Sequence, residues 1–598
     1  MELRNREDIE SQYKWKLKNI YENNTLWEED LKLAEQKAKE LTQYKGKLAE
    51  SANTLYRALK ERDDTEAILE KLFVYARMHK DEDNTDTLYQ GMVDRCNTIF
   101  AEVFAQISFY LPELSAMSKE TAEKFMEQKS ELKIYKFMFE KIFRNKEHVL
   151  SEREEELLAL SSEMAQTADE VFSMFNDADV KFGQIEDENG NKTELTKGRY
   201  VTFLESTNRD VRKNAFLKMN GAYNNMRNTL AATYSGNVKT EKFFASVRKY
   251  NSTRESALDK NNIDLSVYDN LIDTIHNNLP KLEKYLELRK NVLKVDELHM
   301  YDLYVPMVGE FDKKYTFEEA KDIVIKALAP LGEQYITDLK RAFDERWIDV
   351  FESRGKTSGA YSWGTYLTHP YILLNFQGNI DSVFTLAHEL GHSMHSYYSN
   401  KKQAYPNASY TLFVAEVAST VNESLLINYM LNNTEDEKER AYLLNHYLEE
   451  FRGTVFRQVM FAEFEKKAHA MSENREPLTT DTLCEMYYEL NQKYFGKTVS
   501  VDKEIEIEWA RIPHFYRSFY VYQYATGFSA ATALSTAILK NGGESVSKYL
   551  DFLSSGGSKY PLDLLRDAGV DLSTPDAVEA GLTKFGDMTE ELRSILLE

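Results

Sequence analysis

The stretch His388-Glu389-Leu390-Gly391-His392 places two histidines four residues apart around a glutamate. On an α-helix, residues i and i+4 lie about one turn apart on the same face, so both imidazoles can reach one ion. Zinc accepts nitrogen ligands at about 2.0–2.1 Å, and the intervening glutamate can take a proton from a water on the same metal. The spacing therefore predicts a hydrolytic metal centre with His388 and His392 as ligands and Glu389 as the general base.

The sequence around this motif reads as one buried helix over residues 381–399, with Asp381 as its N-cap. Polar residues form one stripe along it, and apolar residues dominate the other side. A buried polar stripe needs partners, because each unpaired group costs about 1–3 kcal/mol. A metal ion would supply them, whereas the alternative is a helix with ordinary structural histidines. His395 on the same stripe either supports a ligand from behind or packs in the core.

A catalytic zinc site usually has three protein ligands and one water, so one ligand must come from elsewhere. A second, largely apolar helix is expected over residues 413–423, with Glu416 and Glu423 on one face. One carboxylate would bind the ion, and the other would hydrogen-bond a ligand histidine from behind. Spacing alone does not order the two, and Glu423 could also form an ordinary salt bridge.

Composition excludes several other classes of protein. Of the 598 residues, 42% are hydrophobic and 29% are charged, which predicts a soluble globular protein. No apolar run approaches the ~18 residues of a membrane span, and the charged N-terminal segment does not resemble a secretory signal. The net charge of −23 disfavours nucleic acid as a partner. With only two cysteines, Cys96 and Cys484, a cytoplasmic location without a disulfide framework is expected.

Most of the chain has the period of amphipathic helices, which predicts a mainly α fold. The pattern changes near Val180, where two short extended segments flank Asn189-Gly190, a strong hairpin signal. We therefore divide the chain into an N-terminal helical region, residues 1–178, and a second region, residues 179–598, that contains the metal motif. Residues 359–367 and 371–376 are also expected to be extended.

Residues 387–395, followed by Phe413-Val414-Ala415-Glu416, resemble the thimet oligopeptidase family of zinc peptidases, and within it the oligoendopeptidase F branch. The resemblance runs nearly end to end, and His369 is one departure from the pattern of this branch, at a position without a catalytic role. By this match, the third ligand to a single Zn²⁺ ion is Glu416. Further matching segments are Trp15 to Tyr21, Gly359-Ala360-Tyr361-Ser362, Pro370 to Phe376, Arg511 to Tyr516 and Tyr520 to Gly527.

The resemblance implies a zinc-dependent endopeptidase that hydrolyses internal bonds of short, unfolded peptides. It also implies a large helical fold of two lobes with a deep substrate channel and a small β-sheet beside the metal helix. Residues 371–376 would be an edge strand that pairs with the peptide backbone, and a plain core strand is the alternative. The expected peptide contacts are Gly359, Ala360, Tyr361, Leu373 and Asn375.

Residues 514–524 contain one histidine, two phenylalanines and four tyrosines. Read as a helix, they would form an aromatic core ladder. Alternatively, their imidazole and hydroxyl groups would stabilise the oxyanion that forms when an amide is attacked. The resemblance favours the second role, with His514 as the first donor, Tyr522 as the preferred tyrosine and Tyr516 as the next.

Two other functions are consistent with the sequence. A dipeptidyl carboxypeptidase of the same family would need a cation for the terminal carboxylate of its substrate, and Arg517 is available for that task. A non-catalytic helical scaffold that binds peptides would carry the motif by accident. The sequence does not determine the preferred cleavage site, the natural peptides or the oligomeric state.

Overall fold

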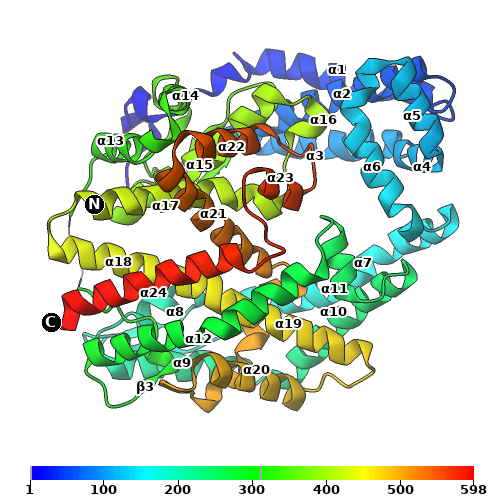
Figure 1. The fold of residues 1–598 in the computed structure, drawn as a ribbon. Coiled ribbons are helices and arrows are strands. Elements are labelled where there is room, and N and C mark those ends of the chain that lie inside the picture. The colour runs from blue at the N-terminus through cyan, green and yellow to red at the C-terminus, as the bar shows by residue number, and fades with distance from the viewer. Residues whose placement is uncertain (1–2, 310, 312, 598) are drawn as a thin grey trace. The chain divides into compact units, whose positions relative to one another are not determined.

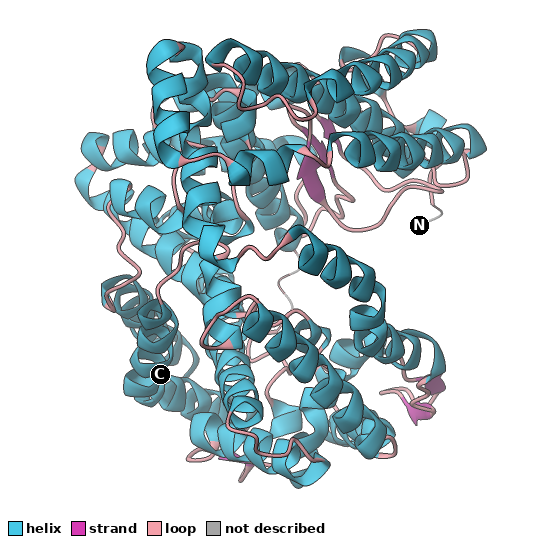
Figure 2. Ribbon diagram, turned by 90° about the vertical axis from the view of Figure 1, so that its right-hand side faces the viewer, coloured by secondary structure: helices cyan, strands magenta, loops and turns pink. Residues whose placement is uncertain are grey.

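The structure is a computed structural model that describes residues 3–309, 311 and 313–597. It consists mainly of helices, and a few short strands interrupt them (Figure 1, Figure 2), which confirms the predicted fold class. The chain forms two compact units, each assembled from three stretches of sequence. The division of the chain at residue 178 stays a prediction. Among the described residues, no helix is both long and apolar enough to cross a membrane.

The first unit comprises Met1–Glu147, Asp312–Tyr429 and Leu534–Val570, and it contains the metal motif. Its N-terminal helices bury a large apolar cluster, in which the Trp27 indole donates a hydrogen bond to the Leu72 carbonyl oxygen at 2.9 Å. Its helices, of which α17 and α21 run across the boundary with the second unit, are α1 (Asn24–Leu41), α2 (Ala52–Glu82), α3 (Thr87–Ile107), α4 (Tyr110–Ala116), α5 (Lys119–Gln128), α6 (Lys136–Arg144), α13 (Phe317–Ala327), α14 (Glu333–Asp344), α15 (Ile380–Lys402), α16 (Tyr405–Ala408), α17 (Leu412–Asn433), α21 (Tyr522–Asn541), α22 (Gly543–Ser554) and α23 (Pro561–Asp567).

The second unit comprises His148–Phe311, Met430–Ala533 and Asp571–Glu598. The predicted hairpin is confirmed, because β1 (Gln184–Glu186) pairs antiparallel with β2 (Lys192–Glu194), and Gly190 adopts the left-handed conformation with φ 77°. A second pair, β3 (Leu298–His299) and β7 (Val499–Ser500), is parallel. The helices are α7 (Glu152–Met174), α8 (Lys197–Leu204), α9 (Arg209–Asn224), α10 (Arg227–Val247), α11 (Thr253–Asp259), α12 (Leu265–Leu293), α18 (Glu437–Phe451), α19 (Arg457–Glu473), α20 (Thr480–Phe495) and α24 (Asp576–Leu597), with the π-helical segment η10 (Arg452–Phe456) and the 3-10 segments η11 (Lys503–Arg511) and η12 (Pro513–Tyr516).

A small sheet lies beside the motif helix α15, where the hydroxyls of Ser362 and Ser393 are 2.7 Å apart. Strand β6 (Tyr371–Leu373) is central, parallel to β4 (Ile348–Asp349) and antiparallel to β5 (Tyr361–Trp363). The prediction of an edge strand over residues 371–376 is therefore wrong. The run is continuously apolar because β6 is buried and flanked on both sides, and of the two edge strands β5 is the less buried.

Both helices predicted around the metal site are present. Helix α15 begins two residues earlier than predicted, because Asn379 rather than Asp381 is its N-cap. The Asn379 side-chain oxygen accepts a hydrogen bond from the Ser382 backbone N–H at 3.0 Å. Helix α17 contains the whole of the predicted second helix and continues beyond it.

Candidate metal centre

Helices α15 and α17 approach each other closely at Gly391 (Figure 1). A Cβ added to this residue would lie 2.5 Å from the Cα of Ser419 and 2.7 Å from the carbonyl oxygen of Ala418. Real Cβ atoms do not come this near to backbone, so only glycine allows the contact. The close approach brings the carboxylates of α17 beside the imidazoles of α15.

We expect Gly391→Ala to destabilise the protein by about 1–3 kcal/mol, because the new methyl group can be accommodated only if the helices separate. Urea unfolding followed by circular dichroism measures this change. Gly91→Ala on α3 is the matched control, since its Cβ would meet nothing within 4 Å, and it should be neutral or stabilising. Equal stability of Gly391→Ala and the unsubstituted protein would show that the contact imposes no constraint.

Three potential ligand atoms converge where these helices meet. Nε2 of His388 lies 3.2 Å from Nε2 of His392, and each of these atoms lies 3.4 Å from Oε2 of Glu416. Ligand atoms in a tetrahedral zinc site with bonds of about 2.0–2.1 Å are separated by about 3.3 Å. The three atoms therefore fit three corners of such a site and leave the fourth corner open. No other group of three histidine, cysteine or acidic side chains in the described part of the chain converges this closely.

Two neighbouring side chains hold the ligand candidates in place. Oε1 of Glu423 lies 3.0 Å from Nδ1 of His388, on the opposite side of the ring from Glu416. The Ser419 hydroxyl lies 3.1 Å from Oε2 of Glu416 and is placed to donate a hydrogen bond to it. The geometry thus distinguishes two carboxylates that sequence spacing could not order. Glu416 faces the ligand nitrogens of both histidines, and Glu423 faces the back of one.

The site is electrostatically suited to a cation. Burial lowers the pKa of His388, but hydrogen bonds and charges from Glu416 and Glu423 outweigh it and raise that pKa to about 11. The hydrogen bonds from His388 and His392 hold the pKa of Glu416 well below its usual range. A dication at the same position competes with the histidine proton, so acid weakens its binding.

Glu389 lies between the two histidines in sequence, with only 6% of its surface exposed. Burial raises the pKa of this carboxyl group, although the nearby imidazoles of His388 and His392 lower it in part. A carboxylate with a raised pKa is a better proton acceptor near neutral pH. Its buried Oε2 has no hydrogen-bond partner among the described residues, so this atom has the capacity to bind a water or a substrate group.

His395 packs against aromatic rings and does not support a ligand histidine in this arrangement. Its ring stacks on Tyr410 at a centroid distance of 3.7 Å and contacts Phe552 at 5.3 Å. Its buried Nδ1 has no hydrogen-bond partner among the described residues, and burial lowers the pKa of His395 to about 3. These contacts favour the core-packing alternative over the supporting role that the sequence also allowed.

The predicted peptide-contact residues occupy two different positions on the small sheet. Residues 359–363 follow the exposed side, where β5 is the edge strand. Leu373 is fully buried in β6, where it pairs with Tyr361. The Asn375 side chain donates to the carbonyl oxygen of Gly359 at 2.8 Å. Leu373 is therefore the inaccessible member of the predicted set, whereas Asn375 is half-buried, as are Ala360 and Tyr361, and holds Gly359 in place.

The aromatic helix predicted over residues 514–524 is wrong. The chain forms η12, leaves helical geometry and enters α21 only at Tyr522. Phe519 interrupts the helix with φ 58°, a left-handed conformation that is costly for a bulky residue. The Phe519 backbone N–H donates to Oε1 of Glu465 at 3.0 Å, and this buried hydrogen bond helps to hold the turn.

This turn decides which tyrosine accompanies His514. The Tyr524 hydroxyl lies 3.4 Å from Nε2 of His514, and the Tyr520 ring lies parallel to the imidazole at a centroid distance of 6.2 Å. Tyr522, the preferred residue from the sequence, is only 2% exposed, and Tyr516 stacks on a neighbouring phenylalanine. Sequence reasoning missed Tyr520 and Tyr524 because it assumed an unbroken helical period.

Family models match most of the chain. The model described as Peptidase family M3 matches residues 202–584, and the model described as Oligopeptidase F matches residues 113–182. Oligopeptidase PepF of Bacillus subtilis is 48% identical over 597 residues, which cover 100% of this chain and 89% of that protein. Group B oligopeptidase PepB of Streptococcus agalactiae is 41% identical and covers 99% of this chain and 98% of that protein.

Solved structures show the same relationship. Oligoendopeptidase-F from Enterococcus faecium is 37% identical with a TM-score of 0.74, covering 96% of this chain and 99% of that chain. A Chlamydophila abortus protein is 36% identical with a TM-score of 0.93, covering 99% of this chain and 100% of that chain. These matches confirm the resemblance read from the sequence. The chain belongs to peptidase family M3, and it is a metal-dependent endopeptidase that cleaves oligopeptides.

Proposed function

We propose that His388, His392 and Glu416 hold one zinc ion, and that the enzyme uses this ion to hydrolyse internal bonds of short unfolded peptides. The observation that carries the proposal is the convergence of three ligand atoms at separations that suit a tetrahedral site. When bound, zinc supplies Lewis-acid chemistry that polarises the scissile carbonyl and acidifies a water. Glu423 contacts Nδ1 of His388 and so would leave Nε2 available to hold the ion.

Glu389 is the proposed general base. It takes a proton from the attacking water and then delivers a proton to the leaving amine, so one carboxyl group serves both steps. Its burial, its raised pKa and its unpaired Oε2 support this role. The raised pKa favours proton uptake from water and still permits release to a more basic amine.

His514 is the proposed donor to the oxyanion that forms on attack, with Tyr524 beside it. Burial, followed by the charge of Arg517, lowers the pKa of His514, which favours its neutral imidazole. A neutral donor stabilises a developing negative charge without having to lose a proton. Tyr522 and Tyr516 are the alternative tyrosines, although each packs among aromatic rings.

We expect His514→Ala to lower kcat by about 10²–10³-fold, with a smaller rise in KM, because the donor acts on the transition state. A quenched fluorescent peptide and a metal assay of the same preparation measure the effect at unchanged metal content. Tyr524→Phe should lower kcat as well, while Tyr522→Phe should not. A change confined to KM would make His514 a binding residue.

The exposed edge of β5 is the proposed docking position for the peptide backbone. An extended peptide can add as a further strand to such an edge, with main-chain hydrogen bonds that do not depend on side-chain identity. Residues 359–361 are the proposed contacts at this edge. Substrate recognition through backbone suits an enzyme that accepts many short sequences, and the net charge of −23 argues against nucleic acid as a partner.

Replacing the C-terminal carboxylate of a substrate peptide by an amide should leave the cleavage rate unchanged within about twofold. An endopeptidase binds on both sides of the cut and does not need the terminal charge, whereas a dipeptidyl carboxypeptidase pairs that charge with a cation. Mass spectrometry of the products identifies the bond that is cut. Loss of cleavage on amidation, restored with the free acid, would favour the carboxypeptidase and Arg517.

A reducing compartment such as the cytoplasm is the proposed location. Cys96 and Cys484 are both free and buried in the structure, so neither contributes a disulfide. Chains that fold without disulfides are typical of reducing compartments.

A further inference from the structure

The second unit contains a small, partly open cavity whose lining includes three arginines, Arg452, Arg457 and Arg511. It offers about 20 Å³ to the centre of a water-sized sphere, which is enough for one small occupant. Glu508 is the only acidic side chain among the described residues that line it, and most of the others are apolar or aromatic. Three guanidinium groups around one small cavity are unusual, because a charged group that is partly or fully removed from water is costly unless it is fully paired.

A π-turn brings two of the arginines together. Helix α18 ends at Phe451, η10 follows, and α19 begins at Arg457. In an α-helix, residues i and i+5 point about 140° apart. In η10 the Arg457 backbone N–H donates to the Arg452 carbonyl oxygen, so these two residues lie about one turn apart and can share a face. Such π-turns are rare and occur frequently at functional sites.

Each guanidinium uses only part of its hydrogen-bonding capacity. Arg452 donates to Glu449 through Nε and Nη2, at 3.2 and 2.9 Å, and Arg457 donates to Glu508 through Nη2 at 2.8 Å. Arg511 also donates to Glu508 through Nη2, while its buried Nε has no partner. Nη1 of all three arginines makes no hydrogen bond to a described residue. Nε of Arg511 is the donor in this group that is buried without an acceptor, and such a donor is costly, so the cavity has room for an acceptor.

The charges around the cavity do not balance. The lining carries three arginines against the single carboxylate of Glu508. Arg452 is paired with Glu449, but the same carboxylate also binds the fully buried Arg289. An added anion would therefore meet a surplus of positive charge in a place that water screens poorly.

The pKa of Tyr304, which lines the cavity, is affected by this surplus of positive charge. Burial raises the pKa of its hydroxyl, but the charges of Arg457, Arg452 and Arg511 outweigh burial and bring the pKa below its usual value. The guanidinium carbon of Arg452 lies 5.0 Å from the centre of the Tyr304 ring. The Tyr304 hydroxyl makes no hydrogen bond to a described residue, so it is a fourth unused donor.

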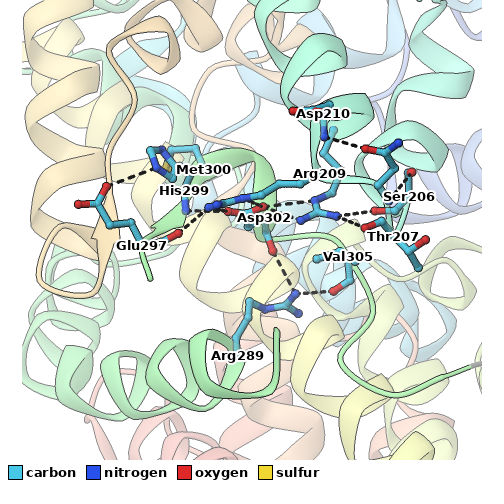
Figure 3. A network of polar contacts seen from close by, with 12 residues as sticks. Ser206, Thr207, Arg209, Asp210, Arg289, Glu297, His299, Met300, Asp302 and Val305 are labelled. Atoms are coloured by element: carbon cyan, nitrogen blue, oxygen red, sulfur yellow. Dashed lines mark hydrogen bonds and ion pairs between the residues drawn. The ribbon is translucent and has the colours of Figure 1, made fainter. Parts of the chain in front are cut away.

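The wall that carries Tyr304 is held rigidly. Two residues earlier, the carboxylate of Asp302 is fully buried and accepts hydrogen bonds at 2.8 Å from Arg209 and from Arg212. Figure 3 shows Arg209 and Asp302 within this polar network. The cavity is therefore preorganised by packed and hydrogen-bonded neighbours, which lowers the cost of ordering it around a ligand.

From these features we infer that the cavity binds one small inorganic anion of about the size of chloride. It is held by Nη1 of Arg452, Arg457 and Arg511 and by the Tyr304 hydroxyl. The anion accepts the unused hydrogen bonds and offsets the surplus charge, and it ties the junction of α18 and α19 to the end of η11. The small volume excludes a peptide or a nucleotide. This inference does not depend on the proposed hydrolytic mechanism.

Bromide, which replaces chloride and scatters anomalously, locates the site directly. Crystals of the full chain grown in gluconate salts are soaked in sodium bromide, and data are collected at the bromine absorption edge. We expect an anomalous peak in the cavity within about 3.2–3.5 Å of the guanidinium nitrogens. An ordered water without anomalous signal at saturating bromide, or a sulfate bound there in preference to bromide, would overturn the assignment.

Thermal unfolding gives a second readout in solution. At constant ionic strength, replacing gluconate by chloride should raise Tm saturably, by about 2–4 °C at 100 times the Kd. Arg457→Met should abolish this chloride response, and so should the double variant Arg457→Met/Glu508→Gln, which leaves the net charge of the cavity lining unchanged. Arg254→Met is the matched control, because Arg254 has similar exposure and pairs with Asp269 elsewhere in the same unit. An equal chloride response in all four proteins would contradict the site.

Discussion

Glu389→Gln should lower peptide cleavage by about 10²–10⁴-fold while leaving one metal ion bound per chain. The amide has nearly the shape of the carboxyl group but cannot accept the proton of the attacking water. Because Glu389 is not one of the three converging ligand residues, its loss removes proton transfer without dismantling the metal site. Steady-state kinetics with a fluorescent peptide and metal analysis of the same sample measure both quantities.

Ser393→Ala on the same helix is the matched control for this substitution. Ser393 is buried near Glu389 and contacts Ser362 rather than the converging ligands, so its variant should retain most of the activity. Turnover of Glu389→Gln at the rate of the unsubstituted enzyme would refute the general-base assignment. Loss of metal in that variant would instead assign Glu389 to coordination.

Glu416→Ala should lose bound metal altogether, because it removes one of only three ligand atoms that converge at the site. Glu423→Ala should weaken metal binding by only about 10–100-fold, since Glu423 acts through the back of the His388 ring. Competition with a fluorescent chelator measures both affinities under the same conditions. Full occupancy in Glu416→Ala, together with loss in Glu423→Ala, would reverse the two roles.

The parts of the site that are local in sequence could be predicted, and the parts that depend on distant contacts could not. His388, Glu389 and His392 lie about one helical turn apart, so their spacing in sequence determines their relative positions once the helix forms. The order of Glu416 and Glu423 depends on how α17 meets α15 at Gly391. Spacing alone gives no information on that approach, and the family resemblance supplied the assignment.

The errors have the same origin. The family resemblance implies an edge strand over residues 371–376, whereas the short apolar run itself indicates only that a strand is buried and not which strands flank it. The aromatic segment was read as one helix, whereas Phe519 adopts a left-handed conformation. The hydrogen bond that holds this turn comes from Glu465, which lies 54 residues away in sequence. Because of this turn, Tyr524 lies beside His514 in place of the predicted Tyr522.

The arginine cavity had no signal in the sequence at all. Its lining comes from several separate segments, and its surplus charge appears only when the partners of each guanidinium are counted. The overall acidity of the chain even points the other way. Local charge in a folded protein is decided by burial and pairing, so composition cannot predict it.

Anomalous diffraction on both sides of the zinc absorption edge shows whether His388, His392 and Glu416 hold a zinc ion. Crystals of the full chain are grown after purification without chelators and with zinc supplied in excess. We expect one zinc peak within about 2.0–2.2 Å of Nε2 of His388, Nε2 of His392 and a carboxylate oxygen of Glu416. A structure in which zinc binds elsewhere, or in which no zinc peak lies among these three side chains, would contradict this expectation.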